Sequence, residues 1–142
     1  MAETHAVFGG EHSAHYYFSE FFNADSGILA AMHILAALGN QEKPLSELMA
    51  SYERYESSGE INTRLESQEE QQERTQAVLD AFADRTESVD TLDGVTVQLR
   101  DTPAWFSVRA SNTEPLLRLN VEAPTKDEVT ALVTEILDII RK

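Results

Sequence analysis

A short polar segment between two apolar, alternating stretches carries the residues best suited to bind an anion. It is Arg109–Pro115, with the sequence RASNTEP, and a second arginine follows in the next stretch. Arginine makes forked contacts with phosphate oxygens, and successive backbone N–H groups in a tight turn can form an anion-binding nest. The predicted phosphate-binding residues are Arg109, Ser111, Asn112, Thr113 and Arg118.

The same segment also has the composition of an ordinary hairpin turn. Because Ser, Asn, Thr and Pro are common turn residues, spacing alone favours a solvated turn with a surface arginine. Charge-assisted hydrogen bonds of about 1.5–3 kcal/mol each would nevertheless let a few such groups hold a phosphate. Both interpretations stay open at this point.

A second polar segment, GGEHSAHYYF, lies near the start of the chain. Glu11, Ser13 and His15 stand two residues apart, so in an extended chain they point to the same side. A carboxylate, a hydroxyl and an imidazole on one side can bind several hydroxyls of a sugar. A metal site built from Glu11, His12 and His15 is a weaker possibility, because no fourth ligand is specified. The structural alternative is a strand end with polar side chains.

The acidic composition limits the possible partners. The 142 residues include 25 Asp and Glu against 11 Lys and Arg, for a formal net charge of −14. Such a field repels nucleic acids and anionic membranes, so we expect neither as a partner. The chain has no cysteine, no secretory signal pattern and no membrane-spanning stretch, which fits a cytoplasmic protein. Sequence motifs of nucleophile elbows, Walker loops and dinucleotide-binding loops are absent.

The first half of the chain predicts two helices after a region of strand and loop. Apolar residues at helical spacing predict a helix over 28–38, with Asp25 or Ser26 as its cap. Because this stretch carries no charged residue, we expect it to be buried on most sides, with His33 as a hydrogen-bonded core residue. Pro44 suits the first turn of a second helix.

The second half predicts an α+β arrangement. A capping box at Ser67 and Glu70 indicates a helix over 68–82, and Asp93–Gly94 is typical of a hairpin turn. Three alternating segments are predicted as strands, at 95–99, 105–110 and 116–121. A second capping box, at Thr125 and Glu128, precedes an amphipathic helix that closes the chain. The expected fold is an antiparallel sheet packed with helices.

Both polar segments resemble motifs of the α-D-phosphohexomutases, in the bacterial phosphomannomutase/phosphoglucomutase branch. GGEHSAHYYF resembles the sugar-reading loop of that family, and RASNTEPLLRLNVEA resembles its C-terminal phosphate-binding loop and the strand that follows. SGEINTRL, between them, also resembles the family. The resemblance implies that residues 1–66 are the incomplete end of an α/β sugar-binding domain 3. It also implies that residues 67–142 form the phosphate-binding domain 4, a TATA-box-binding-protein-like α+β fold.

The resemblance implies a reaction as well. Members of this family interconvert hexose 1-phosphates and 6-phosphates through a phosphoserine, a Mg²⁺ ion and a bisphosphorylated sugar. By matched position, Glu11, Ser13 and His15 would contact hydroxyls of mannose or glucose phosphates, and the RASNTEP loop would hold the non-reacting phosphate. Neither a phosphoserine loop nor an aspartate-rich metal loop is found in this sequence. We therefore expect the catalytic residues and the Mg²⁺ to lie in N-terminal domains of the same enzyme, and the chain alone to be inactive.

Two other functions stay open. One is a non-catalytic phosphosugar-binding or regulatory module of the same fold. The other is an acidic protein-interaction domain that uses the ESQEEQQER segment, which is less favoured because such a charge run is usually a solvated helix face. The preference between mannose and glucose is not predicted.

Overall fold

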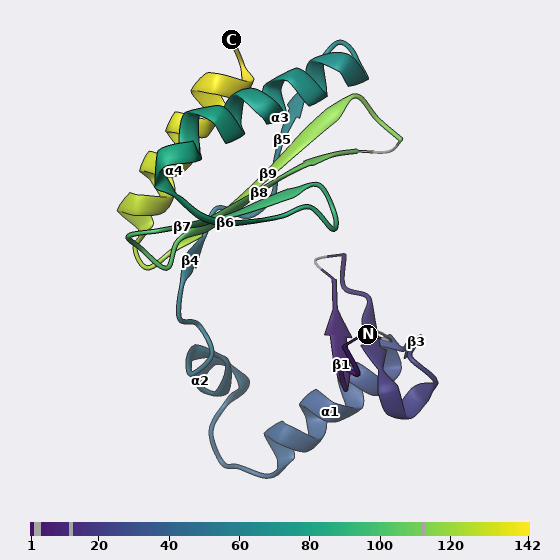
Figure 1. The fold of residues 1–142 in the computed structure, drawn as a ribbon. Helices are drawn as coiled ribbons and strands as arrows, with labels where there is room; N and C mark the ends of the chain where they lie inside the picture. Colours follow the sequence, from purple (N-terminus) through teal and green to yellow (C-terminus); the bar gives the residue numbers. More distant parts are fainter. Residues whose placement is uncertain (2–3, 12, 112) are drawn as a thin grey trace. The chain divides into compact units, whose positions relative to one another are not determined.

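The computed structural model describes all residues except 2–3, 12 and 112. It contains two compact units, Met1–Tyr52 and Glu53–Lys142 (Figure 1). Among the helices of the described residues, none combines the length and the apolar character needed to cross a bilayer.

The first unit is a small antiparallel sheet followed by two helices. Its elements are β1 (Phe8–Gly10), β2 (Tyr16–Phe18), the 3₁₀ helix η1 (Ser19–Phe21), β3 (Ala24–Asp25), α1 (Gly27–Gly39) and α2 (Leu45–Ala50). The strands lie in the order β1-β2-β3. Ser26 caps α1, since its side chain accepts a hydrogen bond from the Leu29 backbone N–H at 3.2 Å. The helix over 28–38 and one of its two possible caps are thus confirmed.

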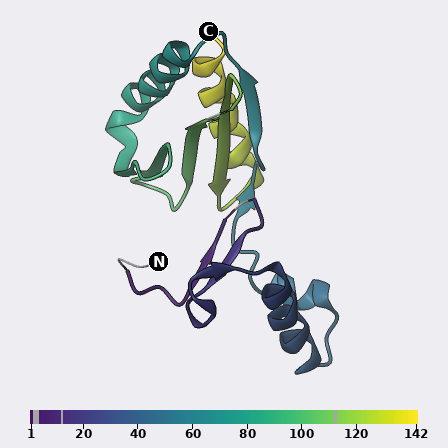
Figure 2. The same cartoon turned by 90° about the vertical axis from the view of Figure 1, so that its right-hand side faces the viewer.

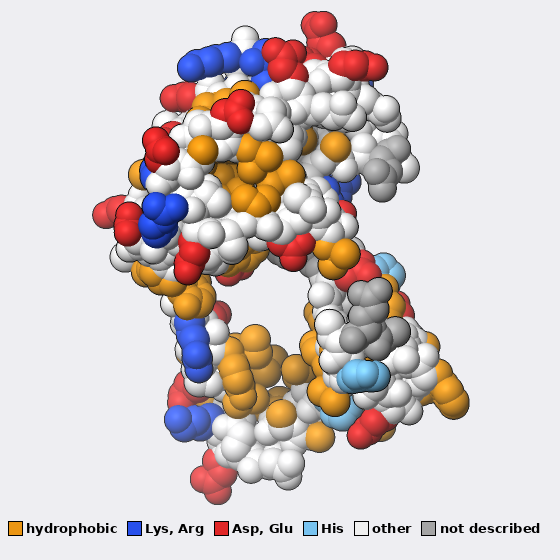
Figure 3. All heavy atoms as spheres, viewed as in Figure 1, with side chains coloured by type: hydrophobic (Ala, Val, Ile, Leu, Met, Phe, Trp, Pro, Cys, Tyr) orange, Lys and Arg blue, Asp and Glu red, His pale blue; other side chains and the backbone are white. Residues whose placement is uncertain are grey.

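The predicted burial of α1 is wrong for this chain. None of its residues is buried, and Ile28, Met32 and Leu35 are 79%, 60% and 65% exposed. The unit therefore presents apolar side chains at its surface, coloured orange in Figure 3. His33 is likewise exposed rather than a hydrogen-bonded core residue, and its ring stacks on Phe18 with centroids 5.2 Å apart. The physical reason is that the apolar pattern reports a preference for burial, whereas the described residues supply no layer against the outer side of the helix.

The second unit is an antiparallel sheet with two helices on one face (Figures 1 and 2). Its elements are β4 (Glu56–Ser57), β5 (Ile61–Arg64), α3 (Gln68–Phe82), the 3₁₀ helix η2 (Ala83–Arg85), β6 (Thr86–Asp90), β7 (Val95–Leu99), β8 (Trp105–Ala110), β9 (Leu116–Ala123) and α4 (Lys126–Ile140). The strand order is β4-β9-β8-β7-β6, and β5 also pairs with β9. This is the predicted α+β class.

Alternation along the strands builds the core of this unit. In β9 every second residue is buried, and in β8 Phe106 and Val108 are buried while their neighbours are partly exposed. The inward side chains meet α3 and α4, where Phe82 packs edge-on against Phe106 at 4.9 Å between ring centroids. Both helices begin at the predicted capping boxes, because Ser67 and Thr125 accept from the backbone N–H three residues later.

The division between the units lies earlier in the chain than the expected 1–66 and 67–142. Residues 53–66 lie with the second unit, because β4 and β5 are strands of its sheet. Ile61 pairs with Leu119, and Glu56 pairs with Ala123. Long-range strand pairing of this kind leaves no local signal in a short polar segment, so the sequence did not reveal it.

Leu119→Ala should lower the free energy of unfolding of the second unit by about 2–5 kcal/mol, since truncation of a fully buried leucine leaves a cavity. Leu92→Ala is the matched control in the same unit; this side chain is 93% exposed, and the change should stay within about 0.5 kcal/mol. Urea denaturation followed by fluorescence of the single tryptophan, Trp105, measures both. Equal effects of the two substitutions would contradict this core.

Candidate functional site

The two predicted phosphate-binding arginines face each other across neighbouring strands. Arg109 in β8 is the direct antiparallel partner of Arg118 in β9. Their neighbours Val108 and Leu119 are buried beneath the helices, so the alternation of the strands puts both arginines on the opposite face of the sheet. The structure thus places two arginines at directly opposed strand positions on one face of the sheet, next to the RASNTEP loop.

Each arginine has a carboxylate partner. Arg109 Nη1 donates to Asp93 Oδ2 at 2.7 Å, and Arg118 Nη1 lies 3.7 Å from Glu60 Oε2. Like charges directly opposite one another destabilise a sheet, and these carboxylates offset the repulsion. Within the described residues, Nε of Arg118 is buried and has no hydrogen-bond partner, so this arginine retains an unused donor.

The turn between β6 and β7 delivers Asp93 to Arg109. Gly94, the next residue, has a φ of +72°, and a Cβ there would lie 2.7 Å from the Val108 carbonyl oxygen and 3.0 Å from the Cα of Arg109. Only glycine fits so close to β8 in this left-handed conformation. The Asp93–Gly94 turn signal therefore also has a role in placing a charged side chain.

The loop between β8 and β9 is ordered by Ser111. Its buried hydroxyl oxygen lies 3.4 Å and 3.3 Å from the backbone nitrogens of Thr113 and Glu114, from which it accepts, and its own N–H donates to the Leu116 carbonyl at 2.8 Å. Thr113 is exposed. Asn112, also predicted to bind phosphate, lies outside the described residues. Ser111 is thus first a residue that shapes the loop, while its hydroxyl hydrogen is still able to donate.

The predicted sugar-contacting residues form the turn between β1 and β2 instead of an extended segment. The backbone N–H of Glu11 donates to the His15 carbonyl at 2.9 Å, and Ala14 has a φ of +65°. The Glu11 carboxylate accepts from Ser13 Oγ at 3.0 Å and from the Tyr17 hydroxyl at 2.6 Å. The turn brings Glu11 and Ser13 into direct contact, which the expected extended geometry does not provide.

His15 is paired with an aspartate that sequence reasoning considered only as a helix cap. His15 Nδ1 lies 2.7 Å from Asp25 Oδ2, and Asp25 Oδ1 accepts from the Tyr16 backbone N–H at 2.8 Å. Ser26 caps α1, which leaves Asp25 available for the imidazole. The sequence offered Asp25 and Ser26 as alternative caps of α1. Ser26 is the cap, and Asp25 contacts His15 instead.

The hydrogen bonds of this turn shift the pKa values of its ionisable groups. The bond from Tyr17 lowers the pKa of Glu11, with a smaller contribution from Ser13, and raises the pKa of the Tyr17 hydroxyl. The bond to Asp25 raises the pKa of His15, and the bond from His15 lowers the pKa of Asp25. The turn therefore favours ionised carboxylates and a more basic imidazole.

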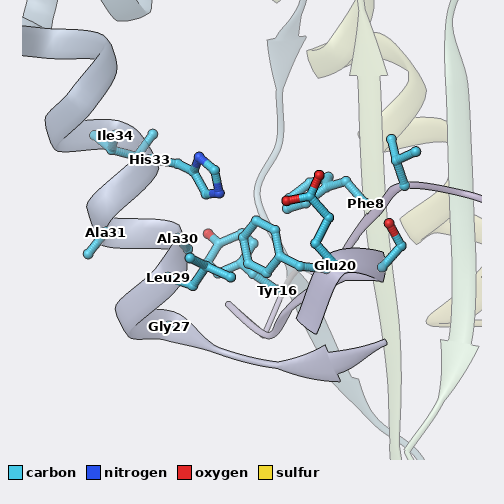
Figure 4. A pocket seen from close by; sticks show the side chains of 12 residues that line it. Phe8, Tyr16, Glu20, Gly27, Leu29, Ala30, Ala31, His33 and Ile34 are labelled. Atoms are coloured by element: carbon cyan, nitrogen blue, oxygen red, sulfur yellow. The ribbon is translucent and has the colours of Figure 1, made fainter. Parts of the chain in front are cut away.

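An apolar hollow of about 820 Å³ lies beside this turn in the same unit (Figure 4). Its walls come from β1, β2 and α1 and include Phe8, Tyr16, Leu29 and His33. Across the described residues, no three or more His, Asp or Glu side chains are arranged to hold a metal ion. The alternative metal site of Glu11, His12 and His15 stays untested, because His12 lies outside the described residues.

Comparison with known proteins identifies the family. Residues 1–55 match "Phosphoglucomutase/phosphomannomutase, alpha/beta/alpha domain III", and residues 60–139 match "Phosphoglucomutase/phosphomannomutase, C-terminal domain". The chain belongs to the phosphoglucomutase/phosphomannomutase family. Both the resemblance and the fold class inferred from the sequence are thereby confirmed.

Relatives of this phosphoglucomutase/phosphomannomutase family chain are longer proteins. It is 39% identical over 142 residues to a phosphomannomutase of Methanocaldococcus jannaschii. The aligned region covers 100% of this chain and 30% of that protein. It is 37% identical over 141 residues to the "phosphohexose mutases" of Xanthomonas campestris pv. campestris, over 98% of this chain and 30% of that protein. The chain thus spans about 30% of the length of these relatives.

A solved structure shares the fold. The crystal structure of a phosphoglucomutase/phosphomannomutase family protein from Burkholderia thailandensis matches with a TM-score of 0.73 and 24% identity, over 99% of this chain and 30% of that one. At this level of identity the match supports the arrangement of the elements alone.

Tyr17→Phe should raise the pKa of Glu11 toward its ordinary value, because it removes the hydroxyl that is the main cause of the lowered pKa. Tyr16→Phe is the matched control, since the carboxylate accepts from Tyr17 and not from Tyr16. An NMR titration of the Glu11 side-chain carboxyl carbon measures both. An unchanged Glu11 pKa in Tyr17→Phe would contradict the hydrogen bond.

Proposed function

We propose that this chain supplies the sugar-contacting and phosphate-holding loops of a phosphohexomutase. The enzyme would interconvert hexose 1-phosphates and 6-phosphates of mannose or glucose through a phosphoserine and a bisphosphorylated sugar. The chain itself would bind and orient the substrate without transferring the phosphoryl group. Family membership supports the class of enzyme, and the names of its relatives, phosphomannomutase and phosphohexose mutases, support the class of substrate.

One observation carries the proposal: the cross-strand pair of Arg109 and Arg118 beside a loop shaped by Ser111. Two arginines at directly opposed strand positions put two positive charges on one face of a sheet, in a chain of net charge −14. A phosphate can accept forked hydrogen bonds from an arginine, whereas Asp93 accepts from a single nitrogen of Arg109. Phosphate binding would therefore exchange a single-point contact for a two-point one.

The energies favour this exchange. Ion pairs between exposed side chains contribute about 0–1 kcal/mol, and Arg109 and Asp93 are 43% and 71% exposed. Arg109 donates one hydrogen bond to Asp93, whereas a forked contact with phosphate would supply two. An incoming phosphate can thus displace Asp93, whose side chain turns to water.

In the first unit, the turn at Glu11–His15 would contact the sugar hydroxyls. Glu11 is ionised and oriented by Ser13 and Tyr17, so it is prepared to accept hydrogen bonds from hydroxyl groups. His15 adds an imidazole nitrogen on the same turn. The non-reacting phosphate would be held by the arginine site of the second unit, where Asn112 and Thr113 are proposed as further ligands.

Arg109→Ala should weaken binding of glucose 1,6-bisphosphate by about 10- to 100-fold, through the loss of one or two charge-assisted hydrogen bonds. Arg109→Lys should weaken it less, because lysine keeps the charge and loses the fork. Backbone amide shifts of residues 111–113 during NMR titration measure the affinity. Arg85→Ala is the control: Arg85 is also half exposed and paired with a carboxylate, Glu135. If both Arg109 variants bind like the wild type, the loop is not the phosphate site.

Asp93→Asn should tighten phosphate binding by about 1.5- to 5-fold, because the anion no longer competes with a carboxylate for Arg109. Glu135→Gln removes the same charge from the partner of Arg85 and should leave the affinity unchanged. Titration with inorganic phosphate at low ionic strength, followed by the same amides, compares the two. Weaker binding in Asp93→Asn would mean that Asp93 orients Arg109 for the ligand instead of competing with it.

A further inference from the structure

A carboxylate in β3, that of Asp25, contacts the turn that carries His15 and determines how its imidazole is oriented. Asp25 lies in β3, where it pairs with Tyr17 of β2, and the next residue caps α1. One carboxylate oxygen accepts from the Tyr16 backbone N–H at 2.8 Å, and the other lies 2.7 Å from His15 Nδ1. With strand pairing on one side and a helix start on the other, the carboxylate has little freedom to move away.

An ionised carboxylate can only accept hydrogen bonds, so a neutral His15 must carry its hydrogen on Nδ1. That choice leaves Nε2 with a free lone pair. The imidazole is 53% exposed, and no hydrogen bond among the described residues reaches Nε2. In water a neutral imidazole favours the other tautomer, with the hydrogen on Nε2, so the protein reverses the ordinary preference.

We propose that Asp25 is a positioning residue that fixes the tautomer and orientation of His15, so that Nε2 accepts a hydrogen bond from a sugar hydroxyl. This inference rests on the proposed function, in which the turn contacts the sugar. Glu11 and neutral His15 then form a pair of acceptors, which selects for ligand groups that donate. Protonation of His15 would convert Nε2 to a donor and alter that selection.

The charged groups that act on His15 are Asp25 on β3 and Glu11 on the same turn. The hydrogen bond to Asp25 is the larger cause of the raised His15 pKa, and the nearby carboxylates of Asp25 and Glu11 add to it. The change from acceptor to donor therefore occurs at a higher pH than in a free histidine. Above that pH, His15 is neutral, and both Nε2 and the Glu11 carboxylate can accept hydrogen bonds.

Asp25→Asn gives a sharp test, because the direction of each hydrogen bond can be worked out. The amide oxygen would keep the bond from the Tyr16 N–H, so the NH₂ group would face His15 and donate to Nδ1. His15 would then carry its hydrogen on Nε2, and its pKa would fall. Long-range ¹H–¹⁵N NMR spectra report which ring nitrogen is protonated, and a pH titration of the same signals gives the pKa.

We expect the Nδ1–H tautomer in the wild type above the His15 pKa and the Nε2–H tautomer in Asp25→Asn. Binding of glucose 1,6-bisphosphate at the same pH should weaken by about 2- to 10-fold in the variant, the effect of one lost hydrogen bond. Glu20→Gln removes an equal charge from η1, and Glu20 is not among the groups that shift the His15 pKa. It should change neither the His15 tautomer nor the affinity for the bisphosphate. A merely structural role for Asp25 would not exchange the tautomers.

The outcomes separate this inference from the proposed function. If glucose 1,6-bisphosphate shifts neither His15 nor residues 111–113 of the wild type, the proposed function fails, and the sugar contact fails with it. If the ligand shifts His15 in the wild type but affinity and tautomer are the same in Asp25→Asn, only the inference fails. The wild-type spectrum decides even if the variant does not fold, since an Nε2–H tautomer there would overturn the role of Asp25.

Discussion

The register of β8 against β9 is the constraint on which the second unit depends, and it places Arg109 directly opposite Arg118. Two guanidiniums opposite each other in an antiparallel sheet repel, and their register is fixed by the buried residues beside them. A slip of one residue in either strand would turn its arginine into the core, at a high cost in desolvation. The packing of α3 and α4 on the other face therefore holds the two charges together.

The acidic chain has carboxylates available to relieve this repulsion, and it brings them from different parts of the sequence. Asp93 comes from the turn before β7, and Glu60 comes from the residue that precedes β5. Interactions between exposed charges are screened beyond about 8 Å at physiological ionic strength, so the local arrangement matters more than the net charge of −14. An anion at the proposed phosphate site would meet two arginines and their local carboxylates instead of the field of the whole chain.

The sequence predicted those features that depend on neighbours along the chain. Capping boxes at Ser67 and Thr125 and the alternation from Val95 onward gave the helices and strands of the second unit nearly to the residue. It did not predict that β4 and β5 join the sheet, because strand pairing is decided by distant residues. For the same reason the charge partners of the arginines were not found: Glu60 and Arg118 are brought together only by the pairing of β5 with β9.

The apolar helix α1 also shows that a local pattern does not reveal contacts with distant residues. The helical spacing of its apolar residues correctly predicted a helix, but periodicity cannot tell which surface covers a helix that is apolar all round. Asp25 was considered only as a possible cap of α1, since a residue next to a helix start is ordinarily interpreted in that way. Its contact with His15 depends on the return of the chain through Phe22 and Asn23, both with positive φ, which no spacing rule indicates.

Each unit holds one carboxylate in a short contact, Asp25 with His15 and Asp93 with Arg109, but the two carboxylates are supported differently. Asp25 is bound by a second hydrogen bond to the backbone and lies in a paired strand, so its pair with His15 is fixed. Asp93 makes a single contact from a turn and is 71% exposed, so its pair with Arg109 can be exchanged. The hydrogen bond to the backbone thus decides whether the carboxylate stays in place or can leave its partner. In the proposed roles, the fixed carboxylate would set the direction in which His15 presents its lone pair, whereas the exchangeable one would neutralise Arg109 until an anion took its place.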